Sequence, residues 1–309
     1  METKKLYDII LLTDGRYLLP NPESSYISNI FEDDFLLTKA LEDKGLRVFR
    51  TNWDDAQMDW SSTRFALFRS TWDYFERIIE FREWLGEASK QTNFINSAQL
   101  VNWNLDKHYL QELNEKGLAI PPTIFLEIGE NRSLEEITSK ITWKKYILKP
   151  AISGAARHTY LFQKSDIQDI TSIFEKLIAS ESMLLQEYQE QIESKGEISI
   201  IVINGKYAFS VLKKAKQGDF RVQDDFGGTL HPYQASKEEI EFAEKSVSLC
   251  AELPLYARVD LIWDNDNQLC LSELELIEPE LWIRRFPEIA ELMANAVFEK
   301  VKDLKPSFS

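Results

Sequence analysis

The sequence predicts an α/β domain followed by two α+β segments. Three observations support this prediction: a length of 309 residues, an amino-terminal third in which apolar strands alternate with helical patterns, and a remainder in which strand pairs and short helices alternate irregularly. A single hydrophobic core usually stops growing at about 250 to 300 residues, so more than one domain is expected. We predict domains at residues 1–98, 99–185 and 186–309.

The amino-terminal domain is predicted to have the order β-α-β-β-α-β, which is typical of a mainly parallel sheet. Its expected strands are residues 7–12, 48–52, 65–69 and 94–96, and its helices run from about Ile30 to Gly45 and from Tyr74 to Ala88. The polar and aromatic run RSTWDY, residues 69–74, ends the third of these strands. Ligands of open α/β sheets bind at that end, so this run marks a candidate pocket.

The middle segment mixes helices and strands. A helix through LDKHYLQELNEKG ends at Gly117, and Pro121-Pro122 imposes an extended entry into the strand TIFLEI. Ser133 and Glu136 form a capping box, and Ser165 to Gln168 caps a second helix that ends near Ser180. Further strands are expected at residues 145–150 and 158–163.

The last segment contains two hairpins. After a strand at residues 183–188, the turn Asn204-Gly205 joins two apolar runs and suits type I′ geometry. A helix from Ser236 to about Leu253 leads to a second hairpin at residues 256–280, and a final helix follows.

Composition excludes several functional classes. The net charge of -15 and pI of about 4.8 argue against nucleic acid or anionic membranes as partners. Two cysteines exclude a disulfide scaffold or zinc cluster and suit a cytoplasmic protein, and the first residues resemble neither a signal peptide nor a membrane span. The glycines form neither a Rossmann nor a Walker motif, and the three histidines lie far apart.

The second hairpin concentrates carboxylates. With Asn265 to Gln268 as a four-residue loop, Arg258 stands opposite Glu275 and Asp260 opposite Glu273. Residues at i and i+2 share one face of a strand, so these four side chains form one charged patch. Like charges opposite one another are destabilising unless they are solvated or bind a cation, and oxygen-only ligation suits magnesium.

Two other interpretations of this hairpin remain open. An antiparallel sheet often has one wet, charged face, which needs no metal. An EF-hand loop from Asp264 to Glu275 would have acids at three of its ligand positions, but Leu269 stands where that loop requires glycine.

Two lysines upstream of the hairpin add to the metal interpretation. Lys107 lies near the start of a helix, and Lys149 ends the apolar strand KYILKP, where a lysine needs an anionic partner. The following turn contains Ser153, Gly154 and Arg157, and its backbone amides are suited to phosphate oxygens. An exposed lysine that closes an edge strand is the alternative for Lys149.

The two lysines, the small-residue turn and the carboxylate hairpin, in this order along the chain, resemble the motifs of the ATP-grasp superfamily, and the resemblance covers the whole chain. The resemblance implies a three-part fold that encloses ATP, with an α/β domain and two α+β subdomains. Lys107 and Lys149 match the lysines that contact ATP phosphates, and Ser153 and Gly154 lie in the loop that covers them. The strand MLLQEY is similar to the hinge that reads adenine. The backbone at Gln186, Glu187 and Tyr188 and the carboxylate of Glu197 are the matching groups, with Glu193 competing for the ribose.

The segment KKAKQGDFRVQDDFGGT is similar to one in glutathione synthetase-like members. The resemblance implies catalytic roles for Arg221 and Arg258 at the transferred phosphoryl group, with Lys213 assisting and Gly227 and Gly228 facing the substrate. It also implies metal ligands, which are Asp260, Glu273 and Glu275. Relatives such as the D-alanine ligases usually have asparagine at the place of Glu275, so this residue either changes the metal number or binds substrate.

A closer resemblance is to the family of ATP-grasp cyclo-ligases of D-cycloserine biosynthesis. It is carried by RSTWDYFERIIEFREWL, WNLDKHYL and ELELIEPELW. These strings imply a substrate pocket formed by Arg69, Ser70, Trp72, Asp73, Tyr74 and Glu278, with Arg284 nearby. Packing at a domain seam is the alternative for Trp72 and Tyr74.

The resemblance implies an ATP-dependent carboxylate-amine ligase or cyclo-ligase that forms an acyl phosphate on a small amino-acid-like substrate. ATP and two Mg²⁺ ions are the expected cofactors, with Mn²⁺ as an alternative, and a homodimer is compatible with the family. One alternative is a glutathione synthetase-like or amino-acid ligase that joins two molecules. Others are a non-catalytic ATP-binding regulatory protein and an interaction domain that binds no nucleotide.

Overall fold

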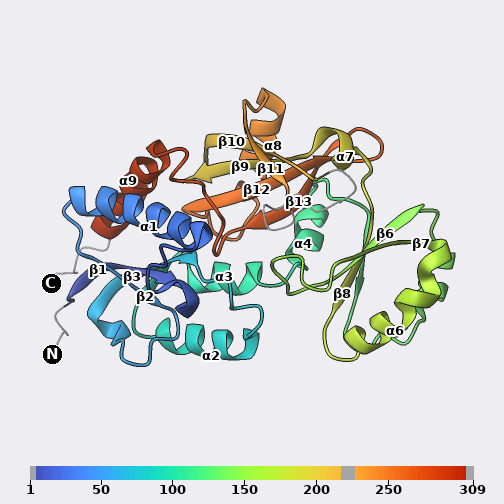
Figure 1. Ribbon diagram of the computed structural model, residues 1–309, viewed down its shortest axis with the longest axis horizontal. Helices are drawn as coiled ribbons and strands as arrows, with labels where there is room; N and C mark the ends of the chain where they lie inside the picture. The colour runs from blue at the N-terminus through green and yellow to red at the C-terminus, as the bar shows by residue number, and fades with distance from the viewer. Residues whose placement is uncertain (1–4, 217–226, 304–309) are drawn as a thin grey trace.

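The computed structural model describes residues 5–216 and 227–303. Within these ranges the chain forms three β-sheets, which follow one another along the molecule in Figure 1. The amino-terminal sheet lies at one end, the sheet of the middle segment at the other, and the carboxy-terminal sheet between them. The domain boundaries predicted after residues 98 and 185 remain predictions.

The amino-terminal sheet has the strand order β2-β1-β3-β4, and every neighbouring pair is parallel. Its strands are β1 (Tyr7–Thr13), β2 (Val48–Asn52), β3 (Thr63–Ser70) and β4 (Asn93–Ile95). The helices of this part are α1 (Ser25–Asp43), α2 (Ile78–Ala88) and α3 (Ala98–Asn104), with the 3-10 helices η1 (Gly15–Tyr17) and η2 (Trp60–Ser62). The predicted parallel α/β arrangement is confirmed.

Helices cover both faces of this sheet, which explains its continuous apolar strands. Ile9 and Leu11 of β1 belong to the same core cluster as Leu37 of α1. Their neighbours Ile10 and Leu12 pack in another cluster with residues of α2. Both helices begin elsewhere than predicted. Helix α1 begins at Ser25 and not at Ile30, because the Ser24 side chain accepts a hydrogen bond from the Ile27 N–H and caps it. Helix α2 begins at Ile78 and not at Tyr74, because turns follow β3.

The sheet of the middle segment has the order β5-β8-β6-β7 and is antiparallel. Its strands are β5 (Thr123–Leu126), β6 (Lys145–Pro150), β7 (Tyr160–Gln163) and β8 (Met183–Glu187). Its helices are α5 (Leu134–Ser139), the 3-10 helix η3 (Lys164–Asp166) and α6 (Ile167–Ile178). The capping box of Ser133 and Glu136 is confirmed, whereas the one predicted at Ser165 is wrong because Gln163 and Asp166 form the box instead.

The helix predicted to end at Gly117 begins later than expected. It is α4 (Tyr109–Glu115), and α3 ends before it at Asn104. In the bend between the helices, the Lys107 N–H donates to the carbonyl oxygen of Ala151 at 2.9 Å. The bend therefore holds Lys107 beside the turn that follows β6.

The carboxy-terminal sheet has the order β11-β10-β9-β12-β13 and is antiparallel. Its strands are β9 (Glu197–Ile203), β10 (Lys206–Lys214), β11 (Thr229–Tyr233), β12 (Tyr256–Trp263) and β13 (Leu269–Glu275). Its helices are α7 (Gln191–Lys195), α8 (Lys237–Ser248) and α9 (Glu288–Asp303). Asn204 and Gly205 both have positive φ, as the predicted turn requires. Helix α7 and strand β11 were not predicted, and α8 ends before the predicted Leu253.

The register of the β12–β13 hairpin matches the prediction at the charged positions. Arg258 pairs with Glu275 and Asp260 with Glu273. Beyond Asp260 the register shifts, so that Trp263 pairs with Leu269 and the loop is one residue longer than predicted. A bulge and a longer loop compensate for one another, and strands on both sides of the loop contradict the EF-hand interpretation.

Side-chain amides of Asn96 and Asn104 satisfy backbone groups along the outer edge of β13 and at the start of β12. The Asn104 side chain donates to the Leu274 carbonyl oxygen at 2.8 Å and accepts from the Leu276 N–H at 2.9 Å. Asn96 likewise donates to the carbonyl oxygens of Tyr256 and Leu276 at 2.9 and 2.8 Å. These side chains replace a neighbouring strand and fix the hairpin to the segment from Asn96 to Asn104.

The carboxy-terminal helix returns to the amino-terminal part. Figure 1 shows α9 beside α1, and one core cluster joins both helices to a face of the parallel sheet and to residues of β9 and β10. In the described part of the chain, no helix has the length and apolar character needed to cross a membrane.

The Asn104→Ala substitution is expected to destabilise the protein by about 2 to 4 kcal/mol, because it leaves a buried N–H and a buried carbonyl oxygen without partners. Urea denaturation measures this change in the free energy of unfolding. The exposed Asn131 provides the matched control, for which Asn131→Ala should change it by less than about 0.5 kcal/mol. Equal effects of the two substitutions would contradict the role assigned to Asn104.

Candidate active site

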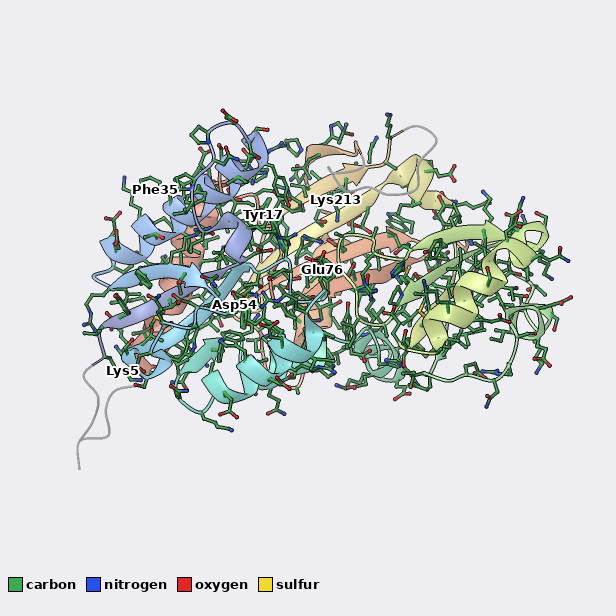
Figure 2. The ribbon with its side chains drawn as sticks, turned by 60° about the horizontal axis from the view of Figure 1, so that its bottom comes forward. Lys5, Tyr17, Phe35, Asp54, Glu76 and Lys213 are labelled. Carbon is green, nitrogen blue, oxygen red and sulfur yellow. The ribbon has the colours of Figure 1, made fainter. Side chains whose placement is uncertain are left out.

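One cavity of about 480 Å³ lies where the three sheets meet. Lys149 and Gln186 contribute from the middle sheet, Asp260 and Glu273 from the carboxy-terminal sheet, and Trp72 from the loop after β3. Figure 2 shows Tyr17, Glu76 and Lys213, which also line the cavity, near the middle of the molecule. A cavity of this size is typical of small-ligand sites.

Asp260 is the most deeply buried charge of the cavity, with 2% exposure. Its carboxylate accepts from the Arg258 guanidinium at 2.9 Å, from Lys213 Nζ at 3.2 Å and from Ser199 Oγ at 2.5 Å. Burial alone would raise the pKa of Asp260, but Arg258 and Lys213 together hold it well below its usual value. The alternative of a solvated charged face is therefore wrong for Arg258 and Asp260.

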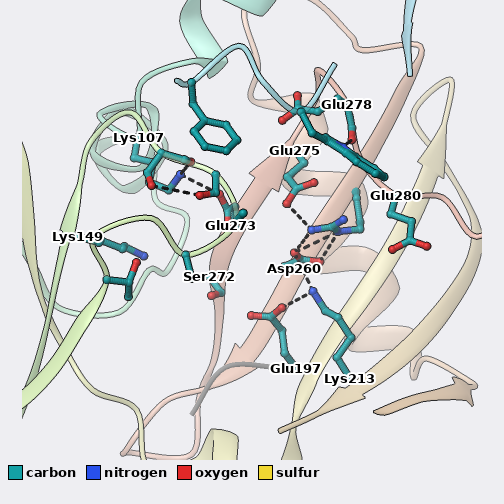
Figure 3. A pocket seen from close by; sticks show the side chains of 18 of the residues that line it. Lys107, Lys149, Glu197, Lys213, Asp260, Ser272, Glu273, Glu275, Glu278 and Glu280 are labelled. Atoms are coloured by element: carbon teal, nitrogen blue, oxygen red, sulfur yellow. Dashed lines mark hydrogen bonds and ion pairs between the residues drawn. The ribbon is translucent and has the colours of Figure 1, made fainter. Parts of the chain in front are cut away.

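Lys213 links this centre to Glu197. The distance from Lys213 Nζ to Glu197 Oε1 is 2.5 Å, and both side chains are buried (Figure 3). Burial raises the pKa of Glu197, which Lys213 opposes. Glu197 lines the cavity, whereas Glu193 is not in its lining and accepts a hydrogen bond from the Tyr188 hydroxyl. The geometry thus favours Glu197 over Glu193 as a ligand-binding carboxylate.

Lys107 and Lys149 lie on the other side of the cavity (Figure 3). Lys107 Nζ is 3.0 Å from Glu273 Oε1 and donates to the Ser153 carbonyl oxygen at 2.9 Å. Lys149 Nζ donates to the side-chain oxygen of Gln186 at 3.3 Å. Burial lowers the pKa of Lys149 to about 8, although Glu273 opposes this shift. An anionic ligand would stabilise the charged form of this lysine.

Carboxylates crowd the opposite wall. Glu275 is paired with the Arg258 guanidinium, and burial raises the pKa of Glu275 to about 7. Burial and the charge of Glu275 raise the pKa of Glu278 to about 8, while the Tyr74 hydroxyl donates a hydrogen bond to its carboxylate. These two carboxyls therefore hold protons more readily than free carboxylates, and a cation at this wall would stabilise their charged forms.

The loop after β6 closes one side of the cavity. Ser153 and Gly154 line it, and Ala155 and Ala156 adopt positive φ angles. A Cβ atom at Gly154 would lie 2.5 Å from the ring of Phe75, so any larger residue there would have to displace this ring. The loop thus contacts the amino-terminal part directly.

The predicted adenine-reading strand lines the cavity at Gln186, Glu187 and Tyr188. The Glu187 N–H donates to the Pro122 carbonyl oxygen and the Tyr188 N–H to that of Lys145. Both amides are therefore engaged. The Glu187 and Tyr188 carbonyl oxygens each accept one side-chain amide, from Gln189 and Asn265, and keep a second acceptor position for a base.

The five residues of the RSTWDY run that were predicted to form the substrate pocket lie in different environments. Trp72 lines the large cavity, and its Nε1 donates to the Glu278 carbonyl oxygen at 2.9 Å. Arg69 and Ser70 line a smaller adjoining cavity, and Asp73 accepts from Trp53 Nε1 at 2.7 Å, away from both. Tyr74 is buried and reaches the site only through Glu278. The direct role predicted for Asp73 is not supported by this geometry.

Arg221 is outside the described residues. Gly227 and Gly228 immediately precede β11 and are absent from the lining of the cavity as described.

Three residues that line the cavity were not predicted from the sequence: Tyr17, Tyr26 and Glu280. Tyr17 ends the 3-10 helix η1 and Tyr26 lies in the first turn of α1, both of which follow β1. The signal for the tyrosines was their place after the first strand of a parallel sheet, the end at which ligands bind. The signal for Glu280 was its place in the acidic run from Glu273.

Glu280 belongs to a chain of ion pairs that reaches into α1. Arg284 Nη2 donates to Glu280 Oε1 at 2.8 Å, and Arg284 Nη1 donates to Asp33 Oδ2 at 2.7 Å. The Arg284 N–H also donates to Asp33 Oδ1 at 2.6 Å. Burial raises the pKa of Asp33 to about 6, although Arg284 opposes the shift.

The oxygen donors of Asp260, Glu273 and Glu275 suit magnesium, which takes carboxylates together with phosphate oxygens. The described residues contain no group of three carboxylate, histidine or cysteine ligands arranged to hold a metal on its own. Instead Lys107 and Arg258 pair with these carboxylates. The donor set therefore fits a metal that arrives with a polyphosphate better than a closed protein site.

Comparison with known proteins identifies the class. A family model described as the RimK-like ATP-grasp domain matches residues 107–277, and one described as the N-terminal domain of D-cycloserine synthetase DcsG matches residues 9–96. Because the first match covers more than half of the chain, the protein belongs to the RimK-like ATP-grasp family. It is an ATP-dependent ligase with the predicted ATP-grasp fold.

Individual relatives agree with this assignment. The cycloserine biosynthesis protein DcsG of Streptomyces lavendulae is 27% identical over 284 residues, which cover 86% of this chain and 93% of that protein. The crystal structure of D-cycloserine synthetase DcsG matches with a TM-score of 0.82 and 25% identity, over 95% of this chain and 99% of the other. The D-alanine–D-alanine ligase from Bacillus anthracis shares the fold, with a TM-score of 0.65, 15% identity and coverage of 96% and 98%.

The raised pKa of Asp33 predicts a pH-dependent stability. The folded state binds a proton at Asp33 more readily than the unfolded chain, so this contribution is present below about pH 4 and is lost as the pH rises through about 6. Relative to Asp33→Asn, the wild-type free energy of unfolding should fall by up to about 3 kcal/mol between pH 4 and 7. Denaturation series at several pH values measure it, and parallel curves would contradict the shift.

Proposed function

We propose that the protein uses ATP to convert the carboxylate of a small amino-acid-like substrate into an acyl phosphate, which an amine then attacks. A carboxylate oxygen attacks the γ-phosphorus, and the bond from this phosphorus to ADP breaks. The amine nitrogen next attacks the acyl carbon, and phosphate leaves. The supporting observation is one cavity with Lys107 and Lys149 on one side and Arg258 among carboxylates on the other.

The cations have distinct parts in this proposal. Lys107 and Lys149 bind ATP phosphates, for which Lys107 exchanges its pairing with Glu273. Arg258 stabilises the negative charge of the transferred phosphoryl group, and its pairing with Asp260 fixes its orientation. No protein nucleophile takes part, because positioning and electrostatics carry phosphoryl transfer.

The metal is proposed to be held by Asp260, Glu273 and Glu275 together with phosphate oxygens. Two Mg²⁺ ions, or Mn²⁺ in their place, would neutralise phosphate charge in the bound complex. Pairing of Glu275 with Arg258 leaves open its other role, a contact with substrate. Gln186, Glu187, Tyr188 and Glu197 are proposed to contact adenosine, and Ser153 and Gly154 the phosphates.

Ring closure within one substrate and joining of two molecules use the same activation step. The high similarity in fold to D-cycloserine synthetase supports ring closure, and the mass of the product distinguishes the two reactions. A non-catalytic ATP-binding protein is disfavoured, because Arg258, Asp260 and Glu273 all face the cavity. The interaction domain without nucleotide is contradicted by the family to which the chain belongs.

Binding of ATP and magnesium should be synergistic. The thermal midpoint should rise more with both than the sum of the rises with each alone, because stabilisation is RT ln(1 + [L]/Kd) and each ligand lowers the Kd of the other. Differential scanning fluorimetry at millimolar concentrations measures this rise. Without any shift, the proposed nucleotide site would have to be withdrawn.

Lys149→Ala and Glu273→Ala should each lower the rate of ADP formation at least about a hundredfold, since each removes a charge that acts on the phosphates or the metal. Coupled detection of ADP measures the rate, and circular dichroism checks the fold. Lys140→Ala and Glu135→Ala are matched controls at exposed positions and should retain wild-type rates. Wild-type turnover of either site variant would refute the proposed roles.

A further inference from the structure

The end of the cavity beyond Glu275 is acidic. Glu76, Glu278 and Glu280 line it. Figure 3 shows Glu278 and Glu280 on the side away from Lys107 and Lys149, where the ATP phosphates are proposed to bind. This end therefore faces the substrate and not the nucleotide.

Both arginines at this end are already paired. Arg16 Nη2 is 2.5 Å from Asp14 Oδ2, and Arg16 Nε donates to the same oxygen at 2.7 Å. Arg284 contacts Asp33 and Glu280 at 2.7 and 2.8 Å. The two cations are thus neutralised within the protein by Asp14 and Asp33, and Glu76 and Glu280 leave an excess of negative charge at this end.

Three aromatic rings line the same end. The ring centroids of Tyr17, Tyr26 and Trp72 lie 5.8 to 5.9 Å from one another, and their planes are inclined by 46° to 72°. The Arg16 guanidinium lies 5.6 Å from the Tyr17 ring centroid, so one of these rings already holds a cation. Electron-rich ring faces attract cations, and the rings therefore agree in sign with the glutamates.

Glu280 is held in place from behind. Its Oε1 accepts from Arg284, which Asp33 fixes through both its guanidinium and its backbone N–H. Asp33 is 4% exposed and belongs to α1, so the chain of contacts is anchored in the first domain. Across the described residues, no hydrogen bond is made by Glu280 Oε2, which leaves this oxygen for a ligand.

We propose that Glu280, with the rings of Tyr17, Tyr26 and Trp72, binds a cationic amino group of the carboxylate substrate and so determines specificity. This inference rests on the proposed function, which places the reacting carboxylate of the same molecule at Arg258. Asp33 and Arg284 are positioning residues, since they orient Glu280 without touching the substrate. A dicarboxylate would bring a second anion to an acidic wall and is rejected.

Trapping with hydroxylamine tests this inference without knowledge of the natural amine, because hydroxylamine converts an acyl phosphate into a hydroxamate and phosphate. The acids to be compared are alanine and serine in both enantiomers, the matched hydroxy acids lactate and glycerate, and the dicarboxylate malate. With ATP and Mg²⁺, kcat/KM for the better amino acid should exceed that for its hydroxy analogue at least about tenfold.

Variants assign the preference to Glu280. Glu280→Gln should lower kcat/KM for the amino acid about tenfold to hundredfold, mainly through KM, and leave the hydroxy analogue within about twofold. Arg284→Ala should act in the same direction, with partial recovery in Arg284→Lys. The exposed Glu252→Gln is the matched control and should behave as the wild type.

Three results would overturn the inference. If hydroxy acids or malate gave hydroxamate as fast as the amino acids do, the inference would be wrong and the proposed function would stay intact. An equal loss for both substrate types in Glu280→Gln would show a structural effect instead of a specificity role. Absence of hydroxamate from every acid would overturn the inference and the proposed function together.

Discussion

Burial of the Asp260 carboxylate is the constraint on which the site depends. A charge with 2% exposure is tolerated only when partners replace its hydration, and here Arg258, Lys213 and Ser199 do so. These partners come from β12, β10 and β9, so neighbouring strands must keep their register for the charge to be compensated. The same contacts point Arg258 into the cavity and draw Lys213 towards Glu197. The contacts that stabilise the sheet are thus the same contacts that orient the side chains of the site.

The hairpin that carries Asp260 is fixed to both other parts of the molecule. Asn96 and Asn104 bind its edge from the amino-terminal side. At its tip, the Asn265 N–H donates to the side-chain oxygen of Gln189, and the Asn265 side chain donates to the Tyr188 carbonyl oxygen, at 2.8 and 3.0 Å. The hairpin that carries the proposed metal ligands is therefore hydrogen-bonded directly to the end of the proposed adenine-binding strand, which relates the two ends of the nucleotide site.

Charge is distributed unevenly across the cavity. Lysines lie where phosphates are proposed, and carboxylates accumulate towards the amino-terminal part, where burial raises the pKa of Glu278 to about 8. A site of this kind opposes folding, because like charges repel one another and buried charges lose their hydration. ATP, a divalent metal and a cationic substrate would each relieve part of this cost.

The sequence by itself determined the parallel first domain, the hairpin register at Arg258 and Asp260, and the residue types of the site, because alternation and turn chemistry are local properties. Lys107, Lys149, Glu197 and Glu273 line the cavity as the resemblance implied. Only the tertiary structure decided which residues of RSTWDY reach the cavity and which are buried behind it. It also brought Tyr17, Tyr26 and Glu280 together, since contacts between segments over 200 residues apart depend on packing that no local pattern encodes.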